Sequence, residues 1–220
     1  MFAKEIYTAR RNKLKTDVGS GIIVLPGNDE VGMNYRDNIY HFRQDSTFLY
    51  FTGIDLPNLV FVIDIDNNTE TLFGDDLTVD QIVWTGPVAP LSVYTAKSGI
   101  DNLQSFSSVE TVLKKAVQQK RQVHFLNPYR GEIIVRMSEW LSMSYREIQK
   151  NVSLVLTRAI IAQRSYKSSE EVAEINKAVD ATAAMQIRAA QLSQQGMAEY
   201  EIAGEIEGVA VSSGGRLSFP

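Results

Sequence analysis

In the first three quarters of the chain, short apolar runs alternate with stretches whose apolar residues recur at helical spacing. Runs of β-forming residues that end at glycine, proline, asparagine or aspartate are typical of strands. The segments with this pattern are residues 21–27, 48–53, 59–65, 69–73, 81–84, 123–126 and 152–156. The turn Asp66-Asn67-Asn68 separates two of them, 59–65 and 69–73, which therefore predict a β-hairpin.

Helical spacing predicts helices between these strands. Apolar residues recur every three or four positions near the N-terminus, over residues 107–119 and over residues 132–149. Strands interleaved with helices are typical of an α/β fold in which the helices pack on the sheet. Because a hairpin adds an antiparallel pair, we expect a mixed β-sheet flanked by helices.

A different pattern begins near Ser168. This serine can cap a helix while Glu171 completes a capping box, and the helical stripe then continues to an expected stop at Gly196. A second helix is predicted from about residue 198 to residue 211, and an extended segment from residue 216 to residue 219.

This change of pattern divides the chain into two predicted domains. Residues 1–163 contain every predicted strand, whereas residues 164–220 contain two amphipathic helices and no complete strand. An amphipathic helix needs an apolar surface to cover. We therefore expect residues 164–220 to be an incomplete domain.

Charge and composition narrow the possible partners. The chain has 220 residues, a net charge of −4 and an isoelectric point near 5.3, so it has no basic surface for nucleic acid or anionic membranes. It has no cysteine, which excludes disulfides and thiolate chemistry. It also has no apolar run of about 18 residues that could span a membrane. We expect a soluble, cytoplasmic protein without nucleic-acid or membrane partners.

The basic N-terminal segment, MFAKEIYTARRNKLK, has two interpretations. A basic amphipathic leader can direct a protein to an organelle or lie on a membrane surface. The interpretation that we favour is a first helix with Phe2, Ile6, Ala9 and Leu14 facing inward and its charges in solvent.

Few residues suggest chemistry. The two histidines, His41 and His124, are far apart and have no ligand neighbour at helical or hairpin spacing, so we interpret both as structural. Residues 64–70 resemble the start of a calcium-binding loop, but Thr69 replaces the glycine that such a loop requires. A turn between two strands explains this segment better.

Arg43, Asp45 and Trp84 are the remaining candidates. In a strand, Arg43 and Asp45 would project to the same face and could clamp a substrate carboxylate. We favour the alternative that they anchor a sheet edge or an interface. Trp84 precedes a Gly-Pro turn, where an aromatic side chain often lies exposed at the rim of a site. The alternative for Trp84 is packing in the core.

Segments in the same order as in a known family cover essentially the whole chain. They are IYHFRQDSTFLYFTGIDLP, VWTG, RSYKSSEEVAEINKA, GMAEYEIAGEIE and GGRLSFP. This set resembles the aminopeptidase P (Xaa-Pro aminopeptidase) family of creatinase-like metallopeptidases. The resemblance implies a creatinase-type N-terminal domain, followed by the first two helices of a truncated pita-bread α+β catalytic domain.

The same resemblance implies an activity. In that family two divalent metal ions, commonly manganese, are held by two Asp, one His and two Glu, and a metal-bridging hydroxide attacks the carbonyl that precedes proline. These ligands would lie beyond Pro220, so the resemblance places no catalytic or metal-binding residue within residues 1–220. It carries over Trp84, whose equivalent lies near the substrate cleft of a neighbouring subunit. It thereby implies a homodimer or homotetramer that acts on peptides with proline at position two.

Two other functions remain open. A non-catalytic relative could keep the fold as a peptide-binding or scaffold module, and a prolidase would be restricted to Xaa-Pro dipeptides. The Trp-x-Gly segment at Trp84 favours the aminopeptidase over the prolidase. For the chain alone, we expect residues 1–220 to be inactive.

Overall fold

The structure is a computed structural model and describes residues 1–35 and 37–217. The chain separates into two compact units, with the division between Ser165 and Tyr166. The extended segment predicted at residues 216–219 lies partly outside the described residues.

The first unit is built on a five-stranded sheet in the order β6-β5-β4-β1-β7. The central hairpin of β4 and β5 is antiparallel, and so is the pair of β1 with β4. The two outer pairs, β1 with β7 and β5 with β6, are parallel. The predicted mixed sheet is therefore confirmed. The strand bounds are Ile22–Pro26 (β1), Val60–Asp64 (β4), Thr69–Phe73 (β5), Asn102–Gln104 (β6) and Val123–His124 (β7).

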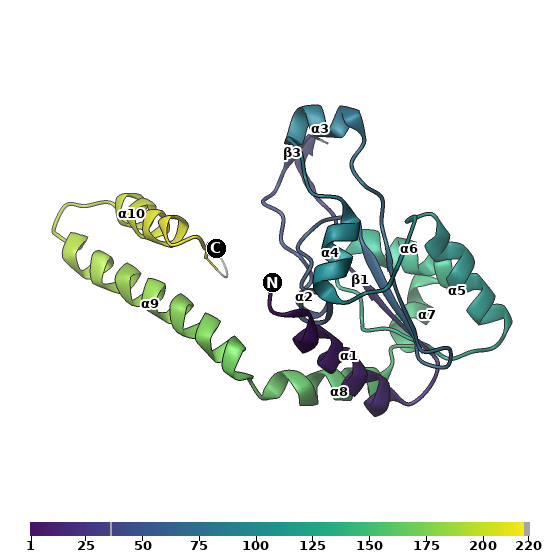
Figure 1. The fold of residues 1–220 in the computed structure, drawn as a ribbon. Coiled ribbons are helices and arrows are strands. Elements are labelled where there is room, and N and C mark those ends of the chain that lie inside the picture. The colour runs from purple at the N-terminus through teal and green to yellow at the C-terminus, as the bar shows by residue number, and fades with distance from the viewer. Residues whose placement is uncertain (36, 218–220) are drawn as a thin grey trace. The chain divides into compact units, whose positions relative to one another are not determined.

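Helices cover both faces of this sheet (Figure 1). Successive side chains of a strand point to opposite faces, so β1 places Ile23 and Leu25 in one apolar cluster and Ile22 and Val24 in the other. A strand covered on both sides has no polar face, and for this reason the central strands read as continuous apolar runs. The helices on the first face are α1 (Lys4–Val18), α2 (Ser46–Thr52), α4 (Leu91–Ser98) and α8 (Leu154–Ser165), and those on the second are α5 (Ser108–Gln118), α6 (Gly131–Leu141) and α7 (Tyr145–Lys150).

Some predicted elements are wrong. Residues 48–52 and 81–84 are not in strands but in helices, α2 and α3 (Val79–Thr85), and Gly53 is the C-cap of α2. The strand predicted at residues 152–156 is the beginning of α8. The long helix predicted over residues 132–149 is two helices, because Ser142 adopts the left-handed conformation and ends α6.

The charges of the N-terminal helix are also not all in solvent. Arg10 and Arg11 are buried, with Tyr7 and Leu14, whereas the predicted core residue Ala9 is exposed. Buried arginines are tolerated when their guanidinium groups are hydrogen-bonded. Arg10 Nη1 donates to the carbonyl oxygen of Tyr50 at 2.9 Å. The helix is thus an integral part of the first unit.

The second unit contains α9 (Ser169–Leu192) and α10 (Glu199–Ser212). The predicted capping box is present, since the side chain of Ser168 accepts from the backbone of Glu171 and the Glu171 carboxylate accepts from the backbone of Ser168. An Arg188–Glu205 ion pair of 2.7 Å joins the two helices. Among the described residues, no helix is both long enough and apolar enough to cross a bilayer.

Candidate functional site

Trp84 lies on α3, a short helix at the tip of the first unit (Figure 1). A capping box begins this helix: Gln81 N donates to Thr78 Oγ1 at 3.3 Å, and Thr78 N donates to Gln81 Oε1 at 2.8 Å. Gly86, at a φ of 80°, ends it. These caps favour helix over strand at positions where the β-propensity of Val83 and Trp84 predicted the reverse.

The apolar side chains of α3 are in solvent. The exposed fractions are 89% for Trp84, 77% for Val79 and 76% for Val83, and the helix has no buried residue. Trp84 is therefore not a core residue. An isolated helix of seven residues is marginal in water, and a cluster of exposed apolar side chains marks an interaction surface. Helix α3 therefore presents a cluster of exposed apolar side chains.

A cavity of about 650 Å³ lies between the segment that carries α3 and the body of the first unit. The base of that segment is closed by Asp76, whose Oδ1 accepts from Leu91 N at 2.7 Å. On the opposite wall, the Arg136 guanidinium lies 4.9 Å from the ring centroid of Phe106 and pairs with Asp29. The segment that carries α3 is thus anchored at its base by the Asp76–Leu91 hydrogen bond, and the cavity separates it from the body of the unit.

Arg43 and Asp45 do not occupy a strand, so the geometry predicted for them is wrong. Residues 41–45 have no regular structure, and Arg43 is exposed. Asp45 is the N-cap of α2: its Oδ1 accepts from Thr47 N at 2.8 Å and from Phe48 N at 2.9 Å. An acidic residue at this position satisfies amides that lack helical partners. The first role of Asp45 is to begin a helix.

The residue between them, Gln44, is buried and holds three loops together. Its Oε1 accepts from Asn28 N at 2.7 Å and from Asp45 N at 2.8 Å. Its Nε2 donates to the carbonyl oxygen of Leu56 at 2.7 Å. A buried amide with every strong bond satisfied fixes the backbone around it. Gln44 therefore positions Asn28 and Asp45 beside each other.

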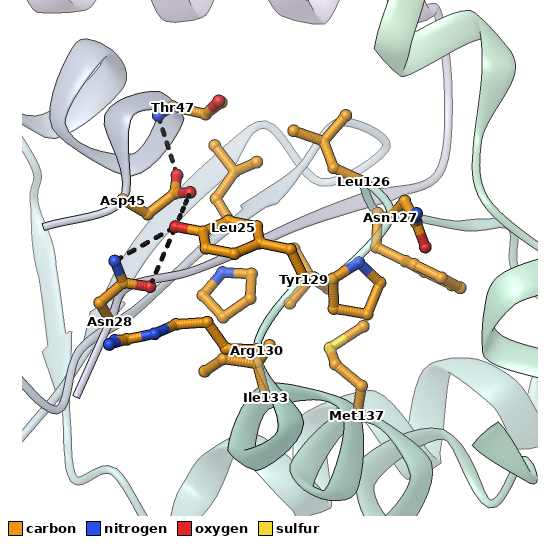
Figure 2. Close-up of a pocket in the computed structure, with 14 residues that line it drawn as sticks. Leu25, Asn28, Asp45, Thr47, Leu126, Asn127, Tyr129, Arg130, Ile133 and Met137 are labelled. Carbon is orange, nitrogen blue, oxygen red and sulfur yellow. Dashed lines mark hydrogen bonds between the residues drawn. The ribbon is translucent and has the colours of Figure 1, made fainter. Parts of the chain in front are cut away.

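A pocket opens next to this pair (Figure 2). Its floor is apolar, and Asn28, Asp45 and Tyr129 meet at one edge, while Thr47, Asn127 and Arg130 are the other polar residues of its lining. The hydroxyl of Tyr129 lies 3.3 Å from Asp45 Oδ2 and 3.4 Å from Asn28 Oδ1. Sequence reasoning missed Asn28 and Tyr129. Tyr129 is 101 residues from Asn28 and 84 residues from Asp45 along the chain. Only the order of the strands brings them together.

The structural role predicted for His124 is confirmed. His124 is buried, with Nδ1 2.7 Å from Ser153 Oγ and Nε2 3.0 Å from the carbonyl oxygen of Ser20. Burial lowers the pKa of His124. The neutral ring therefore links β7 to the start of α8.

The acidic turn at residues 64–70 is a structural ion-pair site. Arg121 donates to Asp64 at 2.8 Å through Nη1 and to Asp66 at 2.7 Å through Nη2. Partial burial raises the pKa of Asp64, but the hydrogen bonds from Arg121 and Asn67 outweigh it, so that this pKa is lowered. The turn interpretation is thus confirmed by β4 and β5 on either side.

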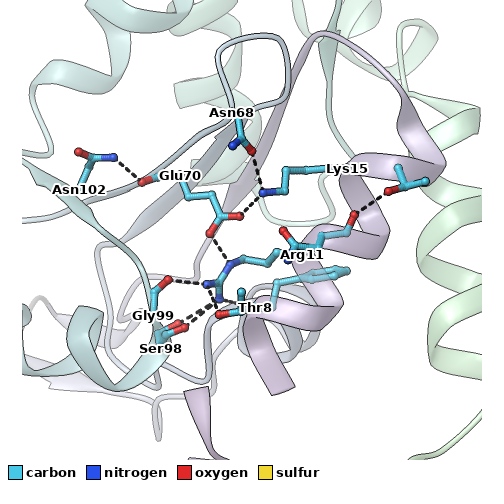
Figure 3. A network of polar contacts seen from close by, with 11 residues as sticks. Thr8, Arg11, Lys15, Asn68, Glu70, Ser98, Gly99 and Asn102 are labelled. Carbon is cyan, nitrogen blue, oxygen red and sulfur yellow. Dashed lines mark hydrogen bonds and ion pairs between the residues drawn. The ribbon is translucent and has the colours of Figure 1, made fainter. Parts of the chain in front are cut away.

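A second charged cluster surrounds Arg11 (Figure 3). Its Nε donates to Glu70 at 2.6 Å, Nη1 to the carbonyl oxygens of Phe51 and Ser98 at 3.0 Å, and Nη2 to that of Gly99 at 2.7 Å. The side chain is fully buried, while that of Glu70 is 13% exposed. Nη1 and Nη2 also lie 3.4 Å from the hydroxyl oxygens of Ser98 and Thr8. These bonds tie α1 to the sheet and to α4.

Within residues 1–35 and 37–217, no three His, Cys, Asp or Glu side chains lie close enough together to hold a metal ion. The described residues therefore do not fit a divalent metal centre. No reaction step can be assigned to them.

Known proteins are similar to this chain in sequence and in fold. The family model for the aminopeptidase P N-terminal domain matches residues 7–124. An Xaa-Pro aminopeptidase from Escherichia coli K12 is 29% identical over 180 residues, which is 77% of this chain and 40% of the relative. A probable Xaa-Pro aminopeptidase from Metarhizium acridum is 24% identical over 94% of this chain and 40% of its own length.

Solved structures agree on the fold. Pseudomonas aeruginosa aminopeptidase PepP superposes with a TM-score of 0.80 at 23% identity, over 97% of this chain and 50% of that one. A zinc-substituted E. coli aminopeptidase P in complex with product gives a TM-score of 0.78 at 23% identity and the same coverage. The chain thus spans 40% of these curated relatives and half of these solved chains. Since the family model covers more than half of the sequence, the chain belongs to the aminopeptidase P N-terminal domain family.

Proposed function

We propose that this chain is the N-terminal portion of a dimetal Xaa-Pro aminopeptidase, which releases the N-terminal residue that precedes proline. In this proposal the chain is not catalytic by itself. It serves self-association and shapes the substrate cleft. Family membership supports the activity, and exposed Trp84 on α3 is the observation that carries the role of this portion.

The specificity has a physical basis. Proline has no amide hydrogen and its ring fixes the backbone. Peptidases that need an amide hydrogen or a flexible backbone at this position therefore handle the bond poorly. A dedicated cleft with aromatic walls can hold such a peptide through its apolar ring. The metal ions, manganese in this proposal, would supply hydroxide at neutral pH. The described residues do not form their site, so residues 1–220 would contribute Trp84 and the surface around it.

The apolar area of α3 supports the proposed self-association. A tryptophan buries about 200 Å² when it is fully covered, which corresponds to about 5 kcal/mol at 25 cal/mol per Å². Val79 and Val83 would add to this value, and losses of rotational freedom would subtract from it. We propose that α3 packs against another copy of the chain, as a homodimer or homotetramer, beside that copy's cleft for peptides with proline at position two. We also propose a cytoplasmic location.

Sedimentation velocity tests the self-association. The unmodified chain should sediment as an oligomer at micromolar concentration, and Trp84→Ala should raise the dissociation constant by about a hundredfold or more. Tyr145→Ala, which removes an exposed aromatic residue of α7, is the matched control and should leave the oligomer intact. A monomeric unmodified chain, or equal association of both variants, would refute the proposed role of α3.

A peptidase assay tests the catalytic part. Residues 1–220 with added Mn²⁺ should release no N-terminal residue from an Xaa-Pro peptide. In an enzyme that carries this chain at its N-terminus, Trp84→Ala should raise KM for longer peptides without changing metal content. Activity of the 220-residue chain above a metal-free blank would show that the catalytic groups have been misplaced.

A further inference from the structure

The pocket beside Asp45 lies where two parallel strands end. Strands β1 and β7 are parallel, and the loops that follow them meet at the pocket, with Asn28 after β1 and Tyr129 after β7. In sheets with parallel strands, ligands bind in the crevice outside the carboxyl ends. The pocket is therefore at the position of this sheet where a ligand site is expected.

Its interior is apolar and large enough for a small branched molecule. The cavity measures about 250 Å³, and Leu25, Phe125, Ile133 and Met137 line its floor. For comparison, an apolar cavity of about 150 Å³ accepts benzene. A branched aliphatic group of about six heavy atoms therefore fits.

The polar edge of the pocket has more acceptors than protons. The Tyr129 hydroxyl accepts from Asn28 Nδ2 at 3.3 Å, and its single proton faces both Asp45 Oδ2 and Asn28 Oδ1, at 3.3 and 3.4 Å (Figure 2). Within the described part of the chain, no other donor reaches Asp45 Oδ2 or Asn28 Oδ1. The helix-capping bonds go to the other carboxylate oxygen, Asp45 Oδ1. At least one acceptor therefore lacks a donor, which a donor-rich ligand would supply.

Two charged side chains, Asp45 and Arg130, line the pocket. Asp45 faces the pocket, whereas the Arg130 charge is compensated by Glu132 at 3.2 Å and its Nη1 donates to the carbonyl oxygen of Asp29 at 3.0 Å. Burial and the charge of Asp45 raise the pKa of Tyr129, and the hydrogen bond with Asn28 and the charge of Arg130 oppose this shift without reversing it. A cation is favoured over an anion here.

Tyr129 is placed to give way to such a ligand. Its side chain crosses the pocket edge, the residue is 71% exposed, and all its hydrogen bonds are 3.3 Å or longer. Long bonds of a neutral hydroxyl are weak compared with those of a charged donor. Rotation of one exposed side chain therefore frees both acceptors.

We propose that this pocket binds a primary ammonium group attached to a branched apolar body. The ammonium donates to Asp45 Oδ2 and Asn28 Oδ1 in place of the Tyr129 hydroxyl, and the apolar body fills the floor. The N-terminal residue of a peptide with an aliphatic side chain and a free alkylamine both have this chemistry. The site does not depend on the proposed peptidase activity.

The experiment is a titration of the ¹⁵N-labelled 220-residue chain by NMR with three probes. Leucinamide has the ammonium and the aliphatic body, N-acetyl-leucinamide lacks the ammonium, and isopentylamine lacks the peptide group. Leucinamide should shift the amide resonances of Asn28, Thr47 and Tyr129, and the acetylated probe should bind at least tenfold more weakly. Equal binding of isopentylamine would identify a free amine as the ligand class. Weaker binding would identify a peptide N-terminus.

Variants of the chain separate the site from general charge effects. Asp45→Asn keeps a good N-cap for α2 but removes the negative charge, so leucinamide should bind about tenfold more weakly. Asp101→Asn, an exposed acid away from the pocket, is the control and should bind as before. Tyr129→Phe removes the competing hydroxyl and should bind at least as tightly. Absence of shifts at the pocket, equal binding of the acetylated probe, or unchanged binding by Asp45→Asn would overturn the proposal.

Discussion

Replacing Arg11 by methionine should cost more stability than any other single charge removal on α1. Methionine keeps an unbranched apolar stem of similar length but removes the guanidinium. The change leaves the carbonyl oxygens of Phe51, Ser98 and Gly99 without their donor and leaves Glu70 with Lys15 as its remaining ion-pair partner, at 3.0 Å.

The magnitude follows from burial. The Arg11–Glu70 pair has side-chain exposures of 0% and 13%, and breaking a buried pair by removing one partner costs about 3–5 kcal/mol. This cost includes the desolvation free energy of the carbonyl groups that lose their donor, because these groups are shielded from water. We expect a loss of about 4 kcal/mol for Arg11→Met. Arg11→Lys should lose about 2 kcal/mol, since one ammonium cannot reach all the acceptors that the guanidinium fork reaches.

Urea unfolding followed by tryptophan fluorescence measures this loss. The chain has two tryptophans, and Trp84→Phe leaves buried Trp140 as a reporter of the first unit. With an m-value of about 2 kcal/mol per molar urea, the midpoint should fall by about 2 M. Lys13→Met, on the exposed side of the same helix, is the control and should change stability by less than about 0.5 kcal/mol. A loss below about 1 kcal/mol for Arg11→Met would refute the reasoning.

Other parts of the first unit give further predictions. His124 has a lowered pKa in the folded state, so the unfolded chain binds more protons and stability should fall as pH drops below about 6.5. His124→Gln should flatten the stability difference between pH 7.5 and pH 5.5, and an unchanged slope would contradict this assignment. Gly53→Ala should cost about 2–4 kcal/mol in urea unfolding, because φ is +68° and the added Cβ would lie 2.3 Å from Tyr7 Oη. Gly19→Ala, at φ +90° facing open space, should cost only about 1 kcal/mol, and equal losses would exclude the contact with Tyr7 as the cause.

Segments whose structure is decided by their own periodicity could be predicted from the sequence. The hairpin of β4 and β5, strand β1 and helix α5 are of this kind, because each buries a regular set of apolar residues. At residues 46–52 the aromatic content favoured a strand, yet burial of Thr47, Phe48, Phe51 and Thr52 has helical spacing. The caps Asp45 and Gly53 were visible in the sequence and are the stronger signal there.

The candidate sites could be predicted only in part. The Gly86-Pro87 turn beside Trp84 indicated that this side chain is exposed, and the role of Trp84 stays a prediction. Burial of Arg11 could not be foreseen, because its acceptors are backbone carbonyls 40 to 88 residues away. The pocket edge at Tyr129 has the same origin, since the parallel pairing of β1 with β7 decides which loops meet. Such pairings depend on topology, to which no single segment's pattern is sensitive.

The contact of α1 with α8 also determines when the first unit can fold during synthesis. Leu14 of α1 lies in one apolar cluster with Leu156 and Ile160 of α8, so the first helix of the unit is covered by its last. The ribosome releases α1 before α8, so the apolar side of α1 stays in contact with water until α8 has emerged. An emerging chain that ends before α8 therefore exposes the apolar side of a basic helix. The packing of the first unit can be completed only after residue 165 has left the exit tunnel.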